Sequence, residues 1–239
     1  MRKAITIGVG LAAAAATAAC DTARGEPGEM TSRSYTFGGF DRIEVAGPYE
    51  VQVRTGGAQS VQATGNERGI ERMIVEVKDG ALRVHPRKRN GWFGSNHGDK
   101  VQLTVTVPAL RGADIAGSGS IAVDRISGDS FEGEIAGSGD LRLGQVEVNR
   151  LKMGIAGSGE IQAAGRARQA EYDIAGSGHI GAAKLVAETA AISIAGSGNI
   201  AGHATGTASV DIAGSGNVAL TGGATCAISK AGSGNVTCS

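Results

Sequence analysis

Residues 155–161 read Ile-Ala-Gly-Ser-Gly-Glu-Ile, and this stretch decides the fold because the chain repeats its centre seven times. The motif A-G-S-G returns at intervals of 18–20 residues, and Ile precedes every copy except the last. The copies begin at Ala116, Ala136, Ala156, Ala175, Ala195, Ala213 and Ala231. Such regular self-similarity is the sequence signature of a repeat architecture.

Apolar residues alternate with polar or small residues on both sides of each motif. Around Ser158, for example, Leu151, Met153 and Ile155 precede the motif and Ile161 follows it. A period of two is typical of strands with one buried face, and the paired glycines indicate a tight turn. The repeat therefore predicts an all-β fold, a parallel β-helix or β-solenoid with coils of 18–20 residues around one core.

Stacked coils would place equivalent residues in columns along the axis. One expected column holds the turn serines, Ser118, Ser138, Ser158, Ser177, Ser197, Ser215 and Ser233. The column two positions later ends in three asparagines, whose amides are suited to bonding along the axis. Earlier in that column stand Asp140, Glu160 and His179, which we expect to be a solvated turn face. The alternative is a weak cation site of three neighbouring ligands, and the sequence predicts no cofactor.

Residues 35–110 lack the repeat but also contain strand patterns. Val101–Val107 alternates throughout, and Asp79-Gly80 separates two strand-like runs as in a β-hairpin. A helix fits only briefly, near Asn66–Met73. We expect this block to cover the N-terminal end of the solenoid and protect its strand edge. It would form a single domain, residues 35–239, together with the repeat coils of residues 111–239.

The first twenty residues predict export. Arg2 and Lys3 precede sixteen uncharged residues, a run too short to span a membrane, and the pattern fits a signal peptide over residues 1–19. Small residues before Cys20 resemble a lipoprotein lipobox, which predicts lipidation of Cys20 and a membrane anchor. Simple cleavage of the signal is the alternative. Residues 20–34 then read as a flexible tether.

Two further cysteines flank the last A-G-S-G motif. Cys226 and Cys238 stand at offsets that point inward in the earlier coils. Because an exported protein meets oxidising conditions, we expect a disulfide that closes this end of the solenoid, with two buried thiols as the alternative. Lys230 replaces the Ile that precedes the motif elsewhere, which indicates that the last coil ends differently.

A basic loop lies between two strands of the N-terminal block. It combines three cations with the only tryptophan of the chain: Arg87, Lys88, Arg89, Trp92 and Phe93. An exposed hairpin loop is one interpretation. The other is a contact loop for an anionic envelope surface.

Composition narrows the function classes. Lys and Arg together equal Asp and Glu at 23 each, and aromatic residues make up 3%. Nucleic acid is therefore not an expected partner, and an aromatic platform for sugars is not expected. No Ser-His-Asp set, phosphate loop or zinc spacing is visible, and the acidic residues are dispersed rather than clustered in a groove.

These observations favour a non-enzymatic exported envelope protein that presents a rigid surface for adhesion or partner binding. The expected partner is an unidentified envelope protein or matrix component. A structural or regulatory accessory of an envelope complex is the first alternative, and a β-helix enzyme that acts on polysaccharides is the second.

Several patterns outside and inside the repeat occur together. They are I-x-V-x-G-x-Y-x-V at Ile43–Val51, G-N-x-x-G-I at Gly65–Ile70, V-x-D-G-x-L-x-V at Val77–Val84, and the A-G-S-G coils. Together they resemble the auto-transporter adhesin, head GIN domain family over residues 35–239. The resemblance implies a right-handed parallel β-helix exported to the bacterial envelope. It implies no activity and brings no catalytic residues.

Overall fold

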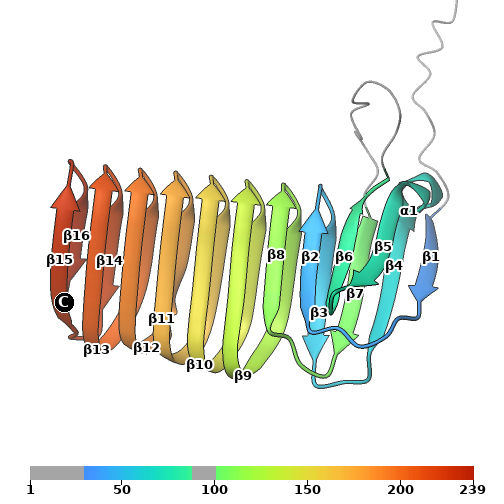
Figure 1. Ribbon diagram of the computed structural model, residues 1–239, viewed down its shortest axis with the longest axis horizontal. Helices are drawn as coiled ribbons and strands as arrows, with labels where there is room; N and C mark the ends of the chain where they lie inside the picture. The colour runs from blue at the N-terminus through green and yellow to red at the C-terminus, as the bar shows by residue number, and fades with distance from the viewer. Residues whose placement is uncertain (1–29, 88–100) are drawn as a thin grey trace, which may run out of the picture.

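The structure, a computed structural model, describes residues 30–87 and 101–239. Strands stack side by side along the long axis of the molecule (Figure 1). The repeat region contains β8 (Gly112–Gly117), β9 (Ser120–Gly137), β10 (Asp140–Gly157), β11 (Glu160–Gly176), β12 (His179–Gly196), β13 (Asn199–Gly214), β14 (Asn217–Thr221), β15 (Thr225–Ala231) and β16 (Asn235–Cys238).

The N-terminal block is also built mainly of strands. It contains β1 (Met30–Tyr35), β2 (Arg42–Ala46), β3 (Glu50–Thr55), β4 (Ser60–Asn66), α1 (Glu67–Arg72), β5 (Met73–Lys78), β6 (Ala81–Pro86) and β7 (Val101–Val107). The brief helix expected near Asn66–Met73 is α1, and its N-terminus is capped by Asn66, whose Oδ1 accepts from the backbone N of Gly69 at 2.6 Å.

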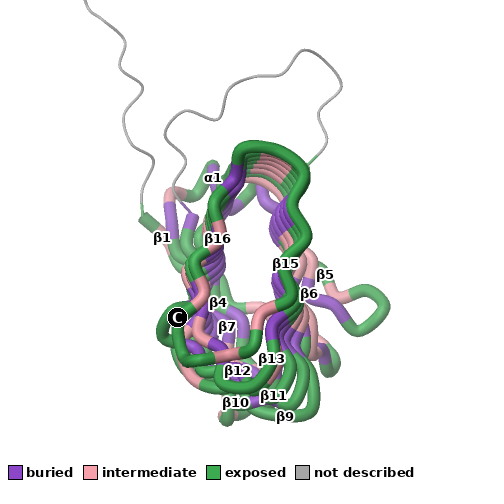
Figure 2. The backbone as a smooth tube through the Cα atoms, turned by 90° about the vertical axis from the view of Figure 1, so that its left-hand side faces the viewer, coloured by how far each residue is buried: buried purple, intermediate pink, exposed green. Residues whose placement is uncertain are grey.

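Each long strand from β9 to β13 bends around the coil and pairs in parallel with its neighbours. Ile135 aligns with Ile155 and then with Ile174, so equivalent residues do stack coil upon coil. Viewed along the axis, the stacked coils form a flattened ring, and buried positions, in purple, recur along its two long sides (Figure 2). The parallel register confirms the predicted β-helix.

The flattened ring has two broad faces and two edges. The β15 face is made by β5, β6, β2, β8, the later halves of β9–β13 and β15, and the β16 face by β1, β4, β7, β3, the earlier halves of β9–β13, β14 and β16. The turn edge carries the A-G-S-G motifs, and the opposite edge carries residues 124–130, 144–150, 164–169, 183–189, 203–207 and 221–225.

Stacking requires both glycines of the turn motif. Gly157 has a φ of 131°, and a Cβ there would lie 2.3 Å from the carbonyl oxygen of Gly137 in the preceding coil. A Cβ on Gly159 would lie 2.7 Å from the carbonyl oxygen of Gly139. The backbone N of Ser158 donates to the Gly137 oxygen at 2.8 Å, so successive turns bond to one another. Any side chain at either glycine would separate the coils.

The N-terminal block contributes coils as well as a cap. β2 pairs in parallel with both β6 and β8, and β3 pairs in parallel with both β7 and β9. The β2–β3 coil is therefore inserted between the β6–β7 coil and the first repeat coil, against the order of the chain. Beyond it, β1, β4 and β5 add antiparallel pairs that end the sheets on this side (Figure 1).

The C-terminal end is less well covered. Ile228 aligns with the buried Val210 but is 51% exposed, because no described strand lies outside β15. Lys230 aligns with the buried Ile212, as the sequence indicates. Its Nζ donates to the carbonyl oxygen of Gly234 at 2.7 Å, so this cation occupies the inward column of the final coil.

The two C-terminal cysteines close the final coil. Cys226 and Cys238 are joined in a disulfide with their Cα atoms 6.7 Å apart. The backbone N of Ser239 donates to the carbonyl oxygen of Leu220 at 3.0 Å. The disulfide thus spans the place where a further opposite edge would continue the solenoid.

Candidate functional site

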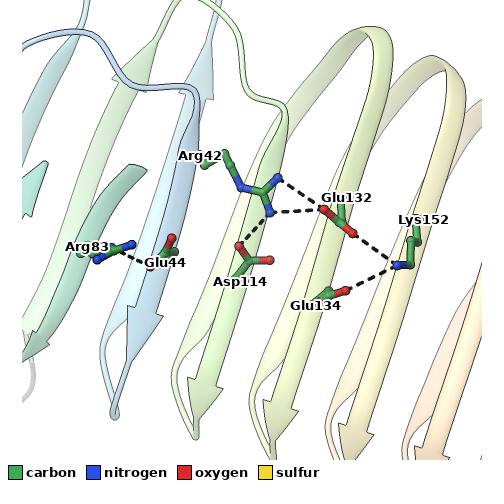
Figure 3. A network of polar contacts seen from close by, with 7 residues as sticks. All are labelled: Arg42, Glu44, Arg83, Asp114, Glu132, Glu134 and Lys152. Carbon is green, nitrogen blue, oxygen red and sulfur yellow. Dashed lines mark hydrogen bonds and ion pairs between the residues drawn. The ribbon is translucent and has the colours of Figure 1, made fainter. Parts of the chain in front are cut away.

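A chain of ion pairs crosses the β15 face near the junction of the N-terminal block and the repeat (Figure 3). Arg42 Nη2 lies 3.1 Å from Asp114 Oδ2 and 3.3 Å from Glu132 Oε2. Lys152 Nζ lies 3.4 Å from Glu132 Oε1 and 3.7 Å from Glu134 Oε1. Because these residues come from β2, β8, β9 and β10, the chain of ion pairs ties the inserted coil to the first repeat coils.

A groove of about 440 Å³ lies at the N-terminal side of this chain of ion pairs. Its floor includes the small side chains of Ala46, Ala116 and Ala136. Its rim contains paired polar side chains: Arg83 Nε lies 2.8 Å from Glu44 Oε2, and His85 Nε2 lies 3.4 Å from Glu76 Oε1. The groove therefore has a floor of small side chains and a polar rim.

A second groove, of about 650 Å³, extends along the axis of the same face. Charged side chains from β2, β9, β10 and β11 line its N-terminal part: Arg42, Glu132, Lys152 and Glu171. Hydroxyl groups from β12 and β13 line the remainder: Thr189, Thr207 and Ser209. Backbone register holds these rows in line, since Thr189 aligns with Thr207 in the next coil. We call this the axial groove.

Burial and neighbouring charges shift several pKa values on this face. Burial raises the pKa of Asp114, and the nearby Arg42 opposes that rise without cancelling it. Burial also raises the pKa of Asp173, and the charge of Glu171 raises it further. The hydrogen bond to Glu132 raises the pKa of Lys152. The two partly buried carboxyl groups of this face, Asp114 and Asp173, therefore bind protons more tightly than free carboxyl groups do.

The turn serines are exposed along the turn edge, as a column of one serine per coil. Next to them the asparagines form the expected ladder: Asn217 Nδ2 donates to Asn199 Oδ1 at 2.9 Å, and the backbone N of Asn235 donates to Asn217 Oδ1 at 3.3 Å. These bonds run from coil to coil and reinforce the turn edge.

The three residues of the alternative weak cation site lie in successive coils at the turn edge. Asp140, Glu160 and His179 do align in successive strands. Glu160 Oε1, however, accepts a hydrogen bond from Gln162 Nε2 at 2.7 Å. Within the two described ranges of the chain, no group of three acidic, histidine or cysteine side chains is placed to hold a metal ion. Alignment one coil apart does not make these side chains converge.

Other predicted site residues lie outside the described residues. These are Cys20 with its signal peptide, and Lys88, Arg89, Trp92 and Phe93 of the basic loop. Arg87 is exposed, and its backbone N donates to the carbonyl oxygen of Arg72 at 2.7 Å. Of the described segments, none forms a helix long and apolar enough to cross a membrane.

Sequence reasoning did not find the chain of ion pairs. The signal for part of it was present, because a coil of 20 residues places Glu132 beside Lys152. Arg42 carried no such signal, since its position beside Glu132 depends on insertion of the β2–β3 coil between strands that are distant in the chain.

Solved structures share this architecture. The chain has a TM-score of 0.80 and 24% identity to a crystal structure of a "putative adhesin" from Bacteroides fragilis, covering 87% of this chain and 96% of that one. A "putative lipid binding protein" from Parabacteroides distasonis gives a TM-score of 0.70 at 25% identity, with 88% and 97% covered. No curated protein matches the chain.

The family comparison agrees with the coil architecture and extends across both the inserted N-terminal coils and the repeat. Residues 39–224 match the family model described as "Putative auto-transporter adhesin, head GIN domain". The match begins just before β2 and ends just before β15, and so includes the ion pairs and both grooves of the β15 face. By this match over most of its length, the chain belongs to the auto-transporter adhesin, head GIN domain family.

Proposed function

We propose that the protein is a non-enzymatic, exported envelope protein that adheres through its β15 face. The axial groove carries this proposal. It crosses coils from β2 to β13, so a single extended partner would meet charged groups at one end and hydroxyl groups at the other. A β-helix suits such a contact, because interlocking coils hold the lining in place before the partner arrives.

Blocking the axial groove tests this function. Ala191→Gln with Ser209→Gln would fill it with two neutral side chains from adjacent coils. The matched control is Ala219→Gln with Thr237→Gln, two aligned and exposed positions on the β16 face. We expect the groove variant to lose retention of the purified protein on washed bacterial envelopes, and the control to keep it. Equal retention of both variants would contradict adhesion through this face.

We further propose that Cys20 carries a lipid that anchors the protein to the envelope membrane, after removal of residues 1–19. The support is the basic pair, the short apolar run and the small residues before Cys20. Cys20→Ser should move the protein from the membrane fraction to the soluble fraction. A wild-type protein that already fractionates as soluble would contradict the anchor and would leave the adhesion proposal intact.

A further inference from the structure

The β16 face has an irregularity at one place, where the strands approach the opposite edge. The pairing of β10 with β11 shifts register between Leu143 and Val146, and that of β11 with β12 shifts between Gln162 and Ala164. The pairing of β12 with β13 shifts after Gly181. Three successive strand pairs thus lose register at neighbouring positions, whereas their A-G-S-G ends remain aligned.

These shifts surround a hollow of about 370 Å³. Small residues from three coils leave it open: Gly144, Ala164, Gly181 and Ala183. A Cβ on Gly144 would lie 2.6 Å from the carbonyl oxygen of Asp124, so close packing of the coils excludes a side chain there.

Two cations and one amide border the hollow, from Arg142, Lys184 and Gln162. Within the described chain, neither Arg142 nor Lys184 forms an ion pair, in contrast to Arg42 and Lys152 on the β15 face. No carboxylate lines the hollow. The nearby Glu160 accepts a hydrogen bond from the Gln162 amide. The His179 ring is also close, with Nε2 3.6 Å from the position that a Cβ on Gly181 would occupy.

We propose that this hollow binds the carboxylates of an acidic polysaccharide that lies along the solenoid axis. The proposal goes beyond the proposed adhesion through the β15 face, because it assigns a ligand class to a site on the other broad face. Arg142 is on β10 and Lys184 on β12, so they are separated along the axis by two coil repeats of about 4.8 Å each. Two carboxylates of one extended polymer, carried by units that are not adjacent, would reach both cations.

The small contribution of each exposed ion pair to binding favours a polymer over a small anion. A solvent-exposed pair strengthens binding by no more than about fivefold, so a single free anion would scarcely be retained. Linked carboxylates gain from effective concentration once the first one is bound. An anionic membrane fits less well, because such surfaces attract clusters of about four to eight cations, and only two line this concave site.

The test compares two double variants that change charge equally. Arg142→Gln with Lys184→Gln removes the two cations of the hollow. Arg68→Gln with Lys78→Gln removes one Arg and one Lys that are exposed and, in the described chain, equally without ion pairs. The probes are polygalacturonate and the same polymer with its carboxylates methyl-esterified. Thermal unfolding of each variant establishes that the fold is intact.

We expect the hollow variant to bind polygalacturonate about fivefold to thirtyfold more weakly than wild type, and the control to stay within about twofold. We also expect the esterified polymer not to bind. Equal weakening in both variants, or undiminished binding of the esterified polymer, would overturn the proposal. So would displacement of the polymer by millimolar inorganic phosphate, or loss of binding to phosphatidylglycerol vesicles without loss of binding to polygalacturonate.

Failure here can be distinguished from failure of the proposed function. If polygalacturonate does not bind but envelope retention still depends on the axial groove, the acidic polysaccharide proposal is wrong and adhesion through the β15 face stands. If the axial-groove variant keeps envelope retention while the hollow variant loses polygalacturonate binding, adhesion through the β15 face is wrong and the acidic polysaccharide proposal stands.

Discussion

The two edges of the solenoid obey different constraints. At the turn edge every coil of the repeat region carries A-G-S-G, and the chain approaches its own copy so closely that a Cβ at Gly157 would lie 2.3 Å from a backbone oxygen. At the opposite edge the sequence changes from coil to coil, the register shifts, and coil lengths vary within 18–20 residues. Identity of sequence is thus required at one edge, and differences in length are absorbed at the other.

Alanine at one glycine of each edge should produce the largest difference. Gly157→Ala should lower the free energy of unfolding by about 3 kcal/mol or more, because left-handed strain of about 1–3 kcal/mol adds to a forced contact of similar size. Gly128, at the opposite edge, has a φ of 146° but no heavy atom within 4 Å of an added Cβ. Gly128→Ala should therefore cost only about 1 kcal/mol. Equal losses in urea unfolding would refute the distinction between the edges.

In the last coil the disulfide joins the two strands, β15 and β16, on the side away from the turn edge. Cys226→Ser with Cys238→Ser should lower the free energy of unfolding by about 2–3 kcal/mol, because the covalent loop no longer restrains the unfolded chain. Faster hydrogen exchange should be confined to β15 and β16. Thiol labelling of the unfolded, non-reduced protein supplies the check, and alkylation of both cysteines would show that no bridge exists.

Side-chain hydrogen bonding between coils also differs at the two edges, as two asparagines show. Asn217 at the turn edge bonds with both the preceding and the following coil. Asn149 at the opposite edge donates only to Asp129 Oδ1, at 3.0 Å, in an exposed position. Asn217→Ala should cost about 1 kcal/mol and Asn149→Ala less than about 0.5 kcal/mol. A larger loss in the Asn149 variant, measured by chemical unfolding, would reverse the assignment of the ladder to the turn edge.

The smallest expected effect on stability comes from the broad faces between the edges, at Asp173, and it depends on pH. Burial and Glu171 raise the pKa of Asp173 above its ordinary value of 3.8, so the folded state binds this proton more tightly than the unfolded state. The wild type should therefore lose stability as pH rises from about 4 through the raised pKa. Asp173→Asn should be more stable than wild type at pH 7, by less than about 1 kcal/mol because this half-buried group is still screened by solvent.

The comparison for this prediction is a pH series of melting temperatures for both proteins. The advantage of the Asp173→Asn variant should shrink below pH 4, where the wild-type carboxyl is protonated in both folded and unfolded states. An advantage that is unchanged across the series would show that the substitution acts through packing and not through titration.

How far sequence could predict the molecule depends on the same contrast. The turn could be derived from Ile155 to Ile161 alone, because each residue there meets its own equivalent one coil away. The β2–β3 insertion could not, because Ile43 meets Leu82 on one side and Ala113 on the other, and no local pattern records either pairing. The hollow beside Arg142 could not be predicted for a related reason. It arises from differences between coils, whereas the repeat pattern describes only what the coils have in common.

Lys230 affects whether a further copy of the protein can extend the solenoid. A solenoid of similar coils is a template for its own continuation, and the exposed strands at β15 and β16 could in principle be extended by another copy, as in a growing fibril. An added coil would have to enclose the Lys230 ammonium in the column that Ile occupies elsewhere. Burying that charge with a carbonyl oxygen but no described carboxylate beside it is unfavourable by several kcal/mol. Lys230 in place of Ile thus disfavours the addition of further copies at β15 and β16, although the stacked coils are complementary to one another.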